Sequence, residues 1–139
     1  MSRGLSHITF ICADLDRMQA VLESVLDATC VYASGEAQFS LSEERFFTVG
    51  DVWIAVMKGE PLTERSYNHV AFKVAEAELT ERAARIKAMG LEMRPARSRV
   101  EGEGRSVYFY GPDGHLFELH TGTLEDRLAR YAAVQETVG

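Results

Sequence analysis

Short apolar runs rich in β-branched and aromatic residues punctuate the first half of the chain and predict strands. The first strand spans residues 5–11, and a helix is expected over 15–26, where apolar residues recur at helical spacing behind Asp14 as N-cap. Three further strands are expected at 30–33, 46–49 and 52–57. Gly50-Asp51, a hairpin turn signal, lies between the last two of them. The first half therefore predicts a βαβββ order.

The second half repeats this order with a period of about 62 residues. A strand over 68–74 precedes a helix over about 76–89, which Gly90 ends as its C′ residue. Further strands are expected at 91–94, 106–110 and 115–120, with a last helix over about 124–136. The letters repeat as well, because residues 6–10 match 68–72. Two copies indicate a duplicated unit and exclude a solenoid.

We therefore predict an α+β fold of two tandem βαβββ modules in a single domain over residues 1–139. The first module covers about 4–60 and the second about 66–122, with the C-terminal helix after it. A chain of 139 residues is the length of one domain, or of two very small modules sharing a core. Such a chain buries only about two-thirds of its unfolded surface, so pairing with a second subunit would help it.

Charge and apolar content narrow the functional class. The formal net charge of −6 argues against a nucleic-acid binder, which needs clustered Lys and Arg. No apolar run approaches the roughly 18 residues that span a membrane. Cys12 and Cys30 lack metal-finger spacing and are interpreted as reduced thiols, which favours a cytoplasmic protein. An anionic substrate would therefore need a local positive site, such as a metal ion or converging arginines.

Two histidines at matched positions of the repeat form the core of a candidate metal site. A lone His on a strand is more often an ordinary hydrogen-bonded residue, but His7 and His69 recur together, and Glu118 lies on the last strand of the second repeat. Two imidazoles and a carboxylate leave open positions for a substrate, as Lewis-acid chemistry requires. This N/O set suits Mn²⁺, Fe²⁺, Zn²⁺, Ni²⁺ or Co²⁺. Glu118 matches roughly Ala55 in the first repeat, so one ion per module pair is expected.

Several motifs resemble the vicinal oxygen chelate superfamily, which includes glyoxalase I, extradiol dioxygenases and fosfomycin resistance proteins. The general signals are the doubled module, the strand histidines and residues 112–115 leading to Glu118. Finer features resemble the fosfomycin resistance group, and within it the hydrolytic FosX type. These features lie at residues 4–10, 67–69, 101–106, 108–110, 118–124 and 127–128.

The resemblance implies a ligand set and an assembly. In that group the phosphonate and epoxide oxygens of the drug bind a Mn²⁺ ion held by residues matching His7, His69 and Glu118. The group forms homodimers with modules paired across the subunits. His7 would then come from one subunit, and the other two ligands from its partner.

The resemblance also implies a reaction, the hydrolysis of the fosfomycin epoxide to a diol, which confers resistance. Residues 39–47 resemble the segment of the hydrolytic members, with Glu44 at the position of the glutamate base. Glu43 is a competing base, and the run of charges could also be solvated. Gly102 and Arg105 stand where the glutathione-transferase pattern has serine and aspartate. A thiol transferase, another glyoxalase-type lyase or isomerase, and a non-catalytic drug-binding protein remain alternatives.

Substrate contacts follow by carry-over from the same group. A phosphonate dianion needs donors beyond the metal, and arginines supply charge-assisted hydrogen bonds. We expect contacts from Thr9, Tyr67, Tyr108 and Arg127, with Ser106 as a further hydroxyl and Arg94, Arg97 and Arg99 as weaker candidates. The segment 97–105 is a polar, glycine-containing loop that could touch a ligand. Trp53 is interpreted as a core residue.

Overall fold

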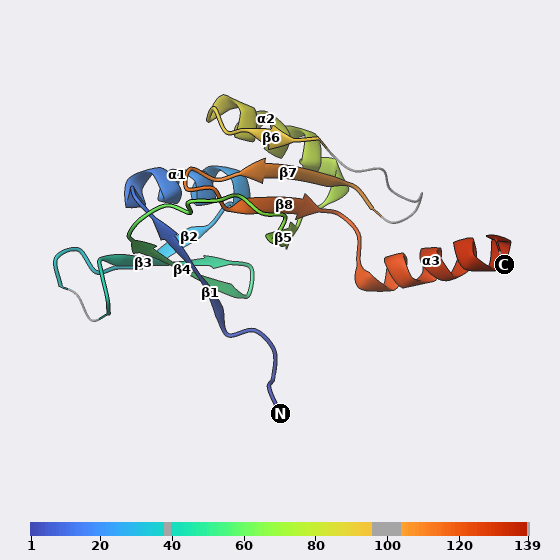
Figure 1. Cartoon of the computed structure of the whole chain (residues 1–139), viewed down its shortest axis with the longest axis horizontal. Coiled ribbons are helices and arrows are strands. Elements are labelled where there is room, and N and C mark those ends of the chain that lie inside the picture. The colour runs from blue at the N-terminus through green and yellow to red at the C-terminus, as the bar shows by residue number, and fades with distance from the viewer. Residues whose placement is uncertain (38–39, 96–103, 139) are drawn as a thin grey trace. The chain divides into compact units, whose positions relative to one another are not determined.

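The computed structural model describes residues 1–37, 40–95 and 104–138, and it divides into two compact units (Figure 1). Unit one comprises Met1–Ser66 together with Tyr110–His115. Unit two comprises Tyr67–Phe109 and the chain from Leu116 onward. The placement of both modules within a single domain stays a prediction. Within the described ranges no helix has the length and apolar character needed to cross a membrane.

Unit one contains a four-stranded sheet in the order β1-β4-β3-β2, with β1 parallel to β4 and the other pairs antiparallel. The elements are β1 His7–Cys12, α1 Leu15–Leu26, β2 Thr29–Ala33, β3 Glu44–Val49 and β4 Val52–Lys58. This order confirms the predicted βαβββ unit. Gly50 lies between β3 and β4 at φ +58°, a conformation that favours glycine in a tight hairpin turn.

Helix α1 covers one face of this sheet and leaves the other face open. Asp14 caps the helix as predicted, because its Oδ1 accepts from the Arg17 amide at 3.1 Å. Apolar side chains on one side of α1, including Met18 and Leu22, are fully buried. Along β1, Phe10 and Cys12 are buried with them, whereas the alternate positions are exposed. Those alternate positions therefore form the open face of unit one.

Unit two repeats the arrangement, with strand order β5-β8-β7-β6 and β5 parallel to β8. Its elements are β5 His69–Lys73, η1 Glu76–Glu78, α2 Leu79–Ala88, β6 Met93–Arg94, β7 Ser106–Tyr110, β8 Leu116–His120 and α3 Leu124–Val138. The helix predicted over 76–89 begins instead with a 3₁₀ turn. Gly90 ends it at φ +70° as predicted: its amide donates to Lys87 O at 2.9 Å, and the Leu91 amide donates to Ile86 O at 3.3 Å.

Strand register confirms the predicted correspondence between the two modules. In unit one Thr9 pairs with Ala55, and in unit two Ala71 pairs with Glu118. Thr9 and Ala71 each lie two residues after the first histidine of their strand. Ala55 is therefore the counterpart of Glu118, and only unit two carries a carboxylate at this position.

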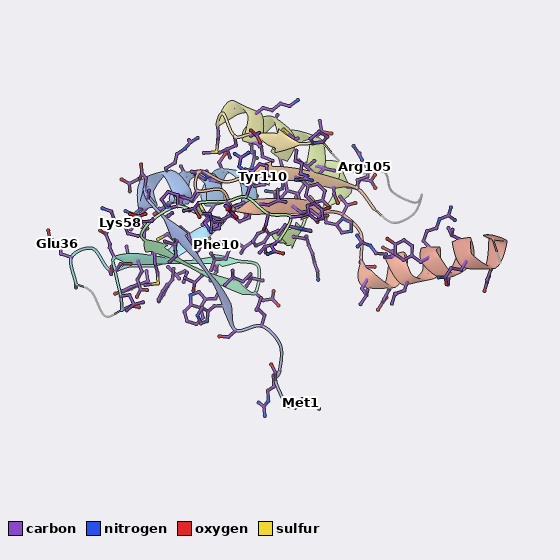
Figure 2. The ribbon with its side chains drawn as sticks, in the orientation of Figure 1. Met1, Phe10, Glu36, Lys58, Arg105 and Tyr110 are labelled. Atoms are coloured by element: carbon purple, nitrogen blue, oxygen red, sulfur yellow. The ribbon has the colours of Figure 1, made fainter. Side chains whose placement is uncertain are left out.

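Matched backbone hydrogen bonds extend this correspondence to the neighbouring strands. The Lys58 amide donates to Glu43 O at 2.8 Å in unit one. In unit two the Thr121 amide donates to Arg105 O at 3.0 Å. Figure 2 labels Lys58 in unit one and Arg105 in unit two. The residues that follow Glu43 and Arg105 therefore hold equivalent places on β3 and β7.

The close approach of two glycines fixes the start of β7. Gly104 has φ +98°, and a Cβ there would lie 2.6 Å from the Gly122 nitrogen and 2.7 Å from its Cα. We expect Gly104→Ala to destabilise the protein by more than the roughly 1–3 kcal/mol of backbone strain alone, because backbone must also move. Gly35→Ala is the matched control, since Gly35 has φ +55° with nothing within 4 Å. Urea unfolding measures the unfolding free energy of both variants. Equal losses of stability in the two would contradict the close packing of Gly104 against Gly122.

Cys12 is a buried thiol with a strongly raised pKa. Burial, followed by the nearby carboxylates of Asp113 and Asp14, raises the pKa of Cys12 to about 12. Cys30 is half-buried, and its thiol donates to Tyr32 O at 3.5 Å. Because the thiolate is the reactive form, we expect iodoacetamide at pH 8 to modify Cys30 well before Cys12. Peptide mass spectrometry follows both sites, with denatured protein as control; equal native rates would refute the prediction.

Candidate metal and substrate site

The backbone of unit two fixes the tautomer of His69. Its Nδ1 lies 2.7 Å from the Tyr67 carbonyl oxygen. A carbonyl oxygen can only accept a hydrogen bond, so Nδ1 must carry the proton. In the neutral ring the lone pair then lies on Nε2, which is the form that binds a metal ion.

A buried carboxylate faces this lone pair. His69 Nε2 lies 3.0 Å from Glu118 Oε1, and the Glu118 side chain is only 6% exposed. Two acceptor atoms at this distance repel each other unless a cation, either a proton or a metal ion, bridges them. Neighbouring ligands at about 2.1 Å from an ion and at right angles to each other lie about 3.0 Å apart. The donor set and the spacing therefore fit a divalent cation.

A chain of hydrogen-bonded side chains begins at the second carboxylate oxygen of Glu118. Ser106 Oγ lies 2.5 Å from Glu118 Oε2 and 2.7 Å from His120 Nδ1. Arg127 Nη2 lies 3.4 Å from His120 Nε2. Glu118, His120 and Arg127 border a cavity of about 310 Å³. Its lining comprises His69, Ala71, Glu118, His120, Gly122, Thr123, Leu124 and Arg127.

A second hollow lies near His69, within the same unit. Tyr67, Arg94, Pro95 and Tyr108 line a cavity of about 210 Å³. The two tyrosine hydroxyls lie 3.2 Å apart, and the Arg94 guanidinium lies over the Tyr67 ring at 4.9 Å. The His69 ring centroid is 4.8 Å from that of Tyr67 and 5.5 Å from that of Tyr108. A cation and two phenols thus lie close to the His69–Glu118 pair.

Unit two thus brings together most of the predicted contacts. The side chains around His69 and Glu118 include those of Tyr67, Arg94, Ser106, Tyr108 and Arg127. Arg97 and Arg99 lie outside the described residues. Sequence reasoning missed any role for His120. The available signal was alternation along a strand, which places His120 on the same face as Glu118.

On the open face of unit one, His7 and Thr9 are both accessible. The His7 ring stacks on Trp53 with centroids 4.2 Å apart, and Ser6 Oγ lies 3.0 Å from its Nδ1. Thr9 follows on the same face, as strand alternation predicts. The interpretation of Trp53 as a core residue is wrong, because its side chain is 37% exposed and supports His7. Trp53 occupies the open face, which α1 does not cover.

Glu44 lies on this same open face. The next residue, Arg45, points toward α1, where it contacts Asp16 and Gln19 at 2.8 Å each. Since successive side chains of a strand alternate, Glu44 points the opposite way. It is the counterpart of Ser106, which contacts the Glu118 carboxylate in unit two. Glu44 is 8% exposed.

Glu43, the competing base, has a different environment. It lines a hollow beside the start of α1 together with Ala13, Asp14, Leu15, Asp16, Arg45 and Lys58. These are positions on the helix-covered side of the sheet. Strand alternation therefore separates Glu43 from His7 and Thr9 and favours Glu44 as the residue directed toward a substrate.

Comparison with known proteins gives consistent matches. Residues 4–119 match the Glyoxalase/Bleomycin resistance protein/Dioxygenase superfamily. Fosfomycin resistance protein FosX of Mesorhizobium japonicum is 61% identical over 132 residues, which cover 95% of each chain. Metallothiol transferase FosB of Shouchella clausii is 36% identical, covering 94% of this chain and 88% of its own.

A solved structure of a relative has the same fold. The structure of a mutant FosX from Listeria monocytogenes, complexed with Mn(II) and 1S,2S-dihydroxypropylphosphonic acid, matches with a TM-score of 0.86 at 52% identity. The match covers 94% of this chain and 99% of that one. The chain therefore belongs to the glyoxalase/bleomycin resistance protein/dioxygenase superfamily and, within it, to the FosX group of fosfomycin resistance proteins.

Proposed function

We propose that this chain is a Mn²⁺-dependent epoxide hydrolase that adds water to fosfomycin and so confers resistance to it. The observation that carries the proposal is the His69–Glu118 pair, whose two acceptor atoms lie 3.0 Å apart, the spacing of neighbouring ligands on a divalent cation. The Listeria relative bound Mn(II) and a dihydroxypropylphosphonic acid, and a vicinal diol is what water addition to an epoxide yields. Both the metal and the product class of the proposal therefore have support.

We assign His7, His69 and Glu118 as the ligands of the ion. Bound there, Mn²⁺ supplies Lewis-acid stabilisation of the charge that develops on the epoxide oxygen. His7 belongs to unit one, whereas the other two ligands belong to unit two. This division is compatible with a homodimer in which His7 of one subunit completes the site of its partner, as the family resemblance implies. A cytoplasmic location is in keeping with the free thiols of Cys12 and Cys30.

Glu44 is the proposed general base. Its carboxylate takes a proton from water as the water oxygen bonds to an epoxide carbon. The carbon–oxygen bond of the strained ring breaks at that carbon, and the epoxide oxygen ends as a hydroxyl after taking up a proton. Water is a weak nucleophile, so removing its proton during attack contributes about 10²–10⁴-fold. Glu44 shares its sheet face with His7 and Thr9, and it is 8% exposed there.

The phosphonate needs positive and hydroxyl donors, and the described residues supply them. Arg127 borders the cavity that contains His69 and Glu118. Tyr67, Tyr108 and Arg94 border the neighbouring hollow. We assign these four residues, with Thr9, to substrate binding. Ser106 is the further hydroxyl predicted at this site, and it donates its proton to Glu118 Oε2. Charge-assisted bonds from arginine would hold the dianion and orient the epoxide.

A thiol transferase is the second candidate, because FosB, a metallothiol transferase, is 36% identical to the chain. The test is to incubate pure protein with Mn²⁺ and fosfomycin and to follow the drug by ³¹P NMR, with and without glutathione or cysteine. Hydrolysis predicts conversion without thiol and no acceleration by it. Conversion of fosfomycin only when a thiol is present would refute the hydrolase proposal and favour a thiol transferase. Protection of the drug without any product would indicate a binding protein.

A further inference from the structure

The hydrogen bonds behind Glu118 have a direction that the chemistry of each group determines. Arg127 Nη2 lies 3.4 Å from His120 Nε2, and a guanidinium can only donate. His120 Nε2 therefore accepts, so the proton of the neutral ring lies on Nδ1. That N–H donates to Ser106 Oγ at 2.7 Å, and Nδ1 also lies 3.3 Å from Glu118 Oε2. The Ser106 hydroxyl proton then goes to Glu118 Oε2 at 2.5 Å.

From this directed chain we infer that His120 is a positioning residue for the metal site, an inference that rests on the proposed function. Arg127 fixes the tautomer of His120, and His120 directs the Ser106 hydroxyl to Glu118 Oε2. The other carboxylate oxygen, Oε1, is thereby kept beside His69 Nε2. Residues that hydrogen-bond to a metal ligand without binding the metal orient that ligand and keep it directed at the metal.

The comparison of the two units supports a specific role. Register pairs Ile11 with Met57 in unit one and Lys73 with His120 in unit two, so Met57 is the counterpart of His120. A methionine has no N–H to donate. The unit with alanine at the carboxylate position thus also lacks the histidine. The hydrogen-bond chain occurs only where there is a carboxylate for it to orient.

Three substitutions at His120 separate this role from mere packing. Measured along the side chain from the backbone, the amide nitrogen of Asn lies about as far out as Nδ1 of histidine. The amide nitrogen of Gln lies about as far out as Nε2. We expect His120→Asn to keep Mn²⁺ affinity within about threefold of wild type. His120→Gln and His120→Phe should each weaken Mn²⁺ binding about 10–100-fold, the usual effect of losing such a partner. Electron paramagnetic resonance of free Mn²⁺, without fosfomycin, measures the affinity.

A double-mutant cycle separates the route through Ser106 from the direct contact of His120 with Glu118 Oε2. If His120 acts through Ser106, then His120→Phe should weaken Mn²⁺ binding little further once Ser106→Ala is present. Additive losses, equal affinities of the Asn and Gln variants, or wild-type affinity of His120→Phe would overturn the inference. Thermal melts of the metal-free variants check folding. Should His120→Phe fail to fold, the comparison of Asn with Gln decides.

The outcomes also distinguish this inference from the proposed reaction. A wild-type protein that binds Mn²⁺ but leaves fosfomycin intact would refute the hydrolase proposal alone, because the His120 comparison uses only metal binding. A wild-type protein that does not bind Mn²⁺ would overturn both.

Discussion

Glu44→Gln is expected to lower kcat for fosfomycin hydrolysis by about 10²–10⁴-fold while leaving Mn²⁺ and fosfomycin binding close to wild type. The amide keeps the size of the side chain but cannot take a proton from water. The metal ligands and the phosphonate donors are other residues, so binding should survive. Steady-state kinetics followed by ³¹P NMR, together with calorimetric titration of Mn²⁺ and then fosfomycin, would measure the two effects separately.

Glu43→Gln is the matched control for this prediction. Glu43 is the adjacent carboxylate, but it borders the hollow beside the start of α1 and not the open face. The same chemical change at that position should leave kcat within about twofold of wild type, since surface substitutions rarely perturb a structure. A large loss in Glu43→Gln with none in Glu44→Gln would reverse the assignment of the base. Similar small losses of kcat in both variants would show that neither glutamate acts as a general base.

Glu118→Gln is expected to abolish high-affinity Mn²⁺ binding and, with it, detectable hydrolysis. The substitution replaces a carboxylate ligand with a neutral amide whose NH₂ group can only donate. Ligand loss should be visible without substrate. Wild-type protein with Mn²⁺ at a hundred times its Kd should gain about 2.7 kcal/mol of unfolding free energy, and the variant should gain almost none. Urea unfolding with and without Mn²⁺ measures the difference.

The metal-free protein provides the critical comparison for this substitution. Glu118 is buried, and its carboxylate faces the lone pair of His69. Replacing it by Gln removes a buried charge, so the metal-free variant should be as stable as the metal-free wild type or more so. Glu78→Gln is a control at an exposed glutamate that pairs with Arg82 on a helix surface. A Mn²⁺-dependent gain retained in Glu118→Gln would refute the assignment of this ligand.

Sequence patterns predicted the elements and the matched positions of His7 and His69 because both depend on local or repeated features. Strand and helix periodicities are local, and the duplication alone places His7 and His69 at equivalent positions of two equivalent strands. The Ala55–Glu118 correspondence also followed from the repeat, and strand register confirmed it. The Glu44 assignment began as a resemblance, and strand alternation next to Arg45 adds a physical reason for it.

Other features could not be predicted because they depend on three-dimensional surroundings. Trp53 is large and apolar, which predicts a core residue, yet it lies on the sheet face that α1 does not cover. The first turn of the helix predicted from residue 76 is 3₁₀, a distinction that apolar spacing does not make. The role of His120 depends on which ring nitrogen carries the proton, and this follows only from its contacts with Arg127 and Ser106.

The source of the oxygen atom added to the drug distinguishes water addition from thiol transfer. Purified protein is incubated with Mn²⁺ and fosfomycin in H₂¹⁸O without thiol, and the product is analysed by mass spectrometry. The account predicts a dihydroxypropylphosphonate carrying one ¹⁸O atom, formed only when Mn²⁺ is present, with strongly reduced formation by Glu44→Gln. Unchanged fosfomycin under these conditions, or a product that forms only after a thiol is added and contains its sulfur, would contradict it.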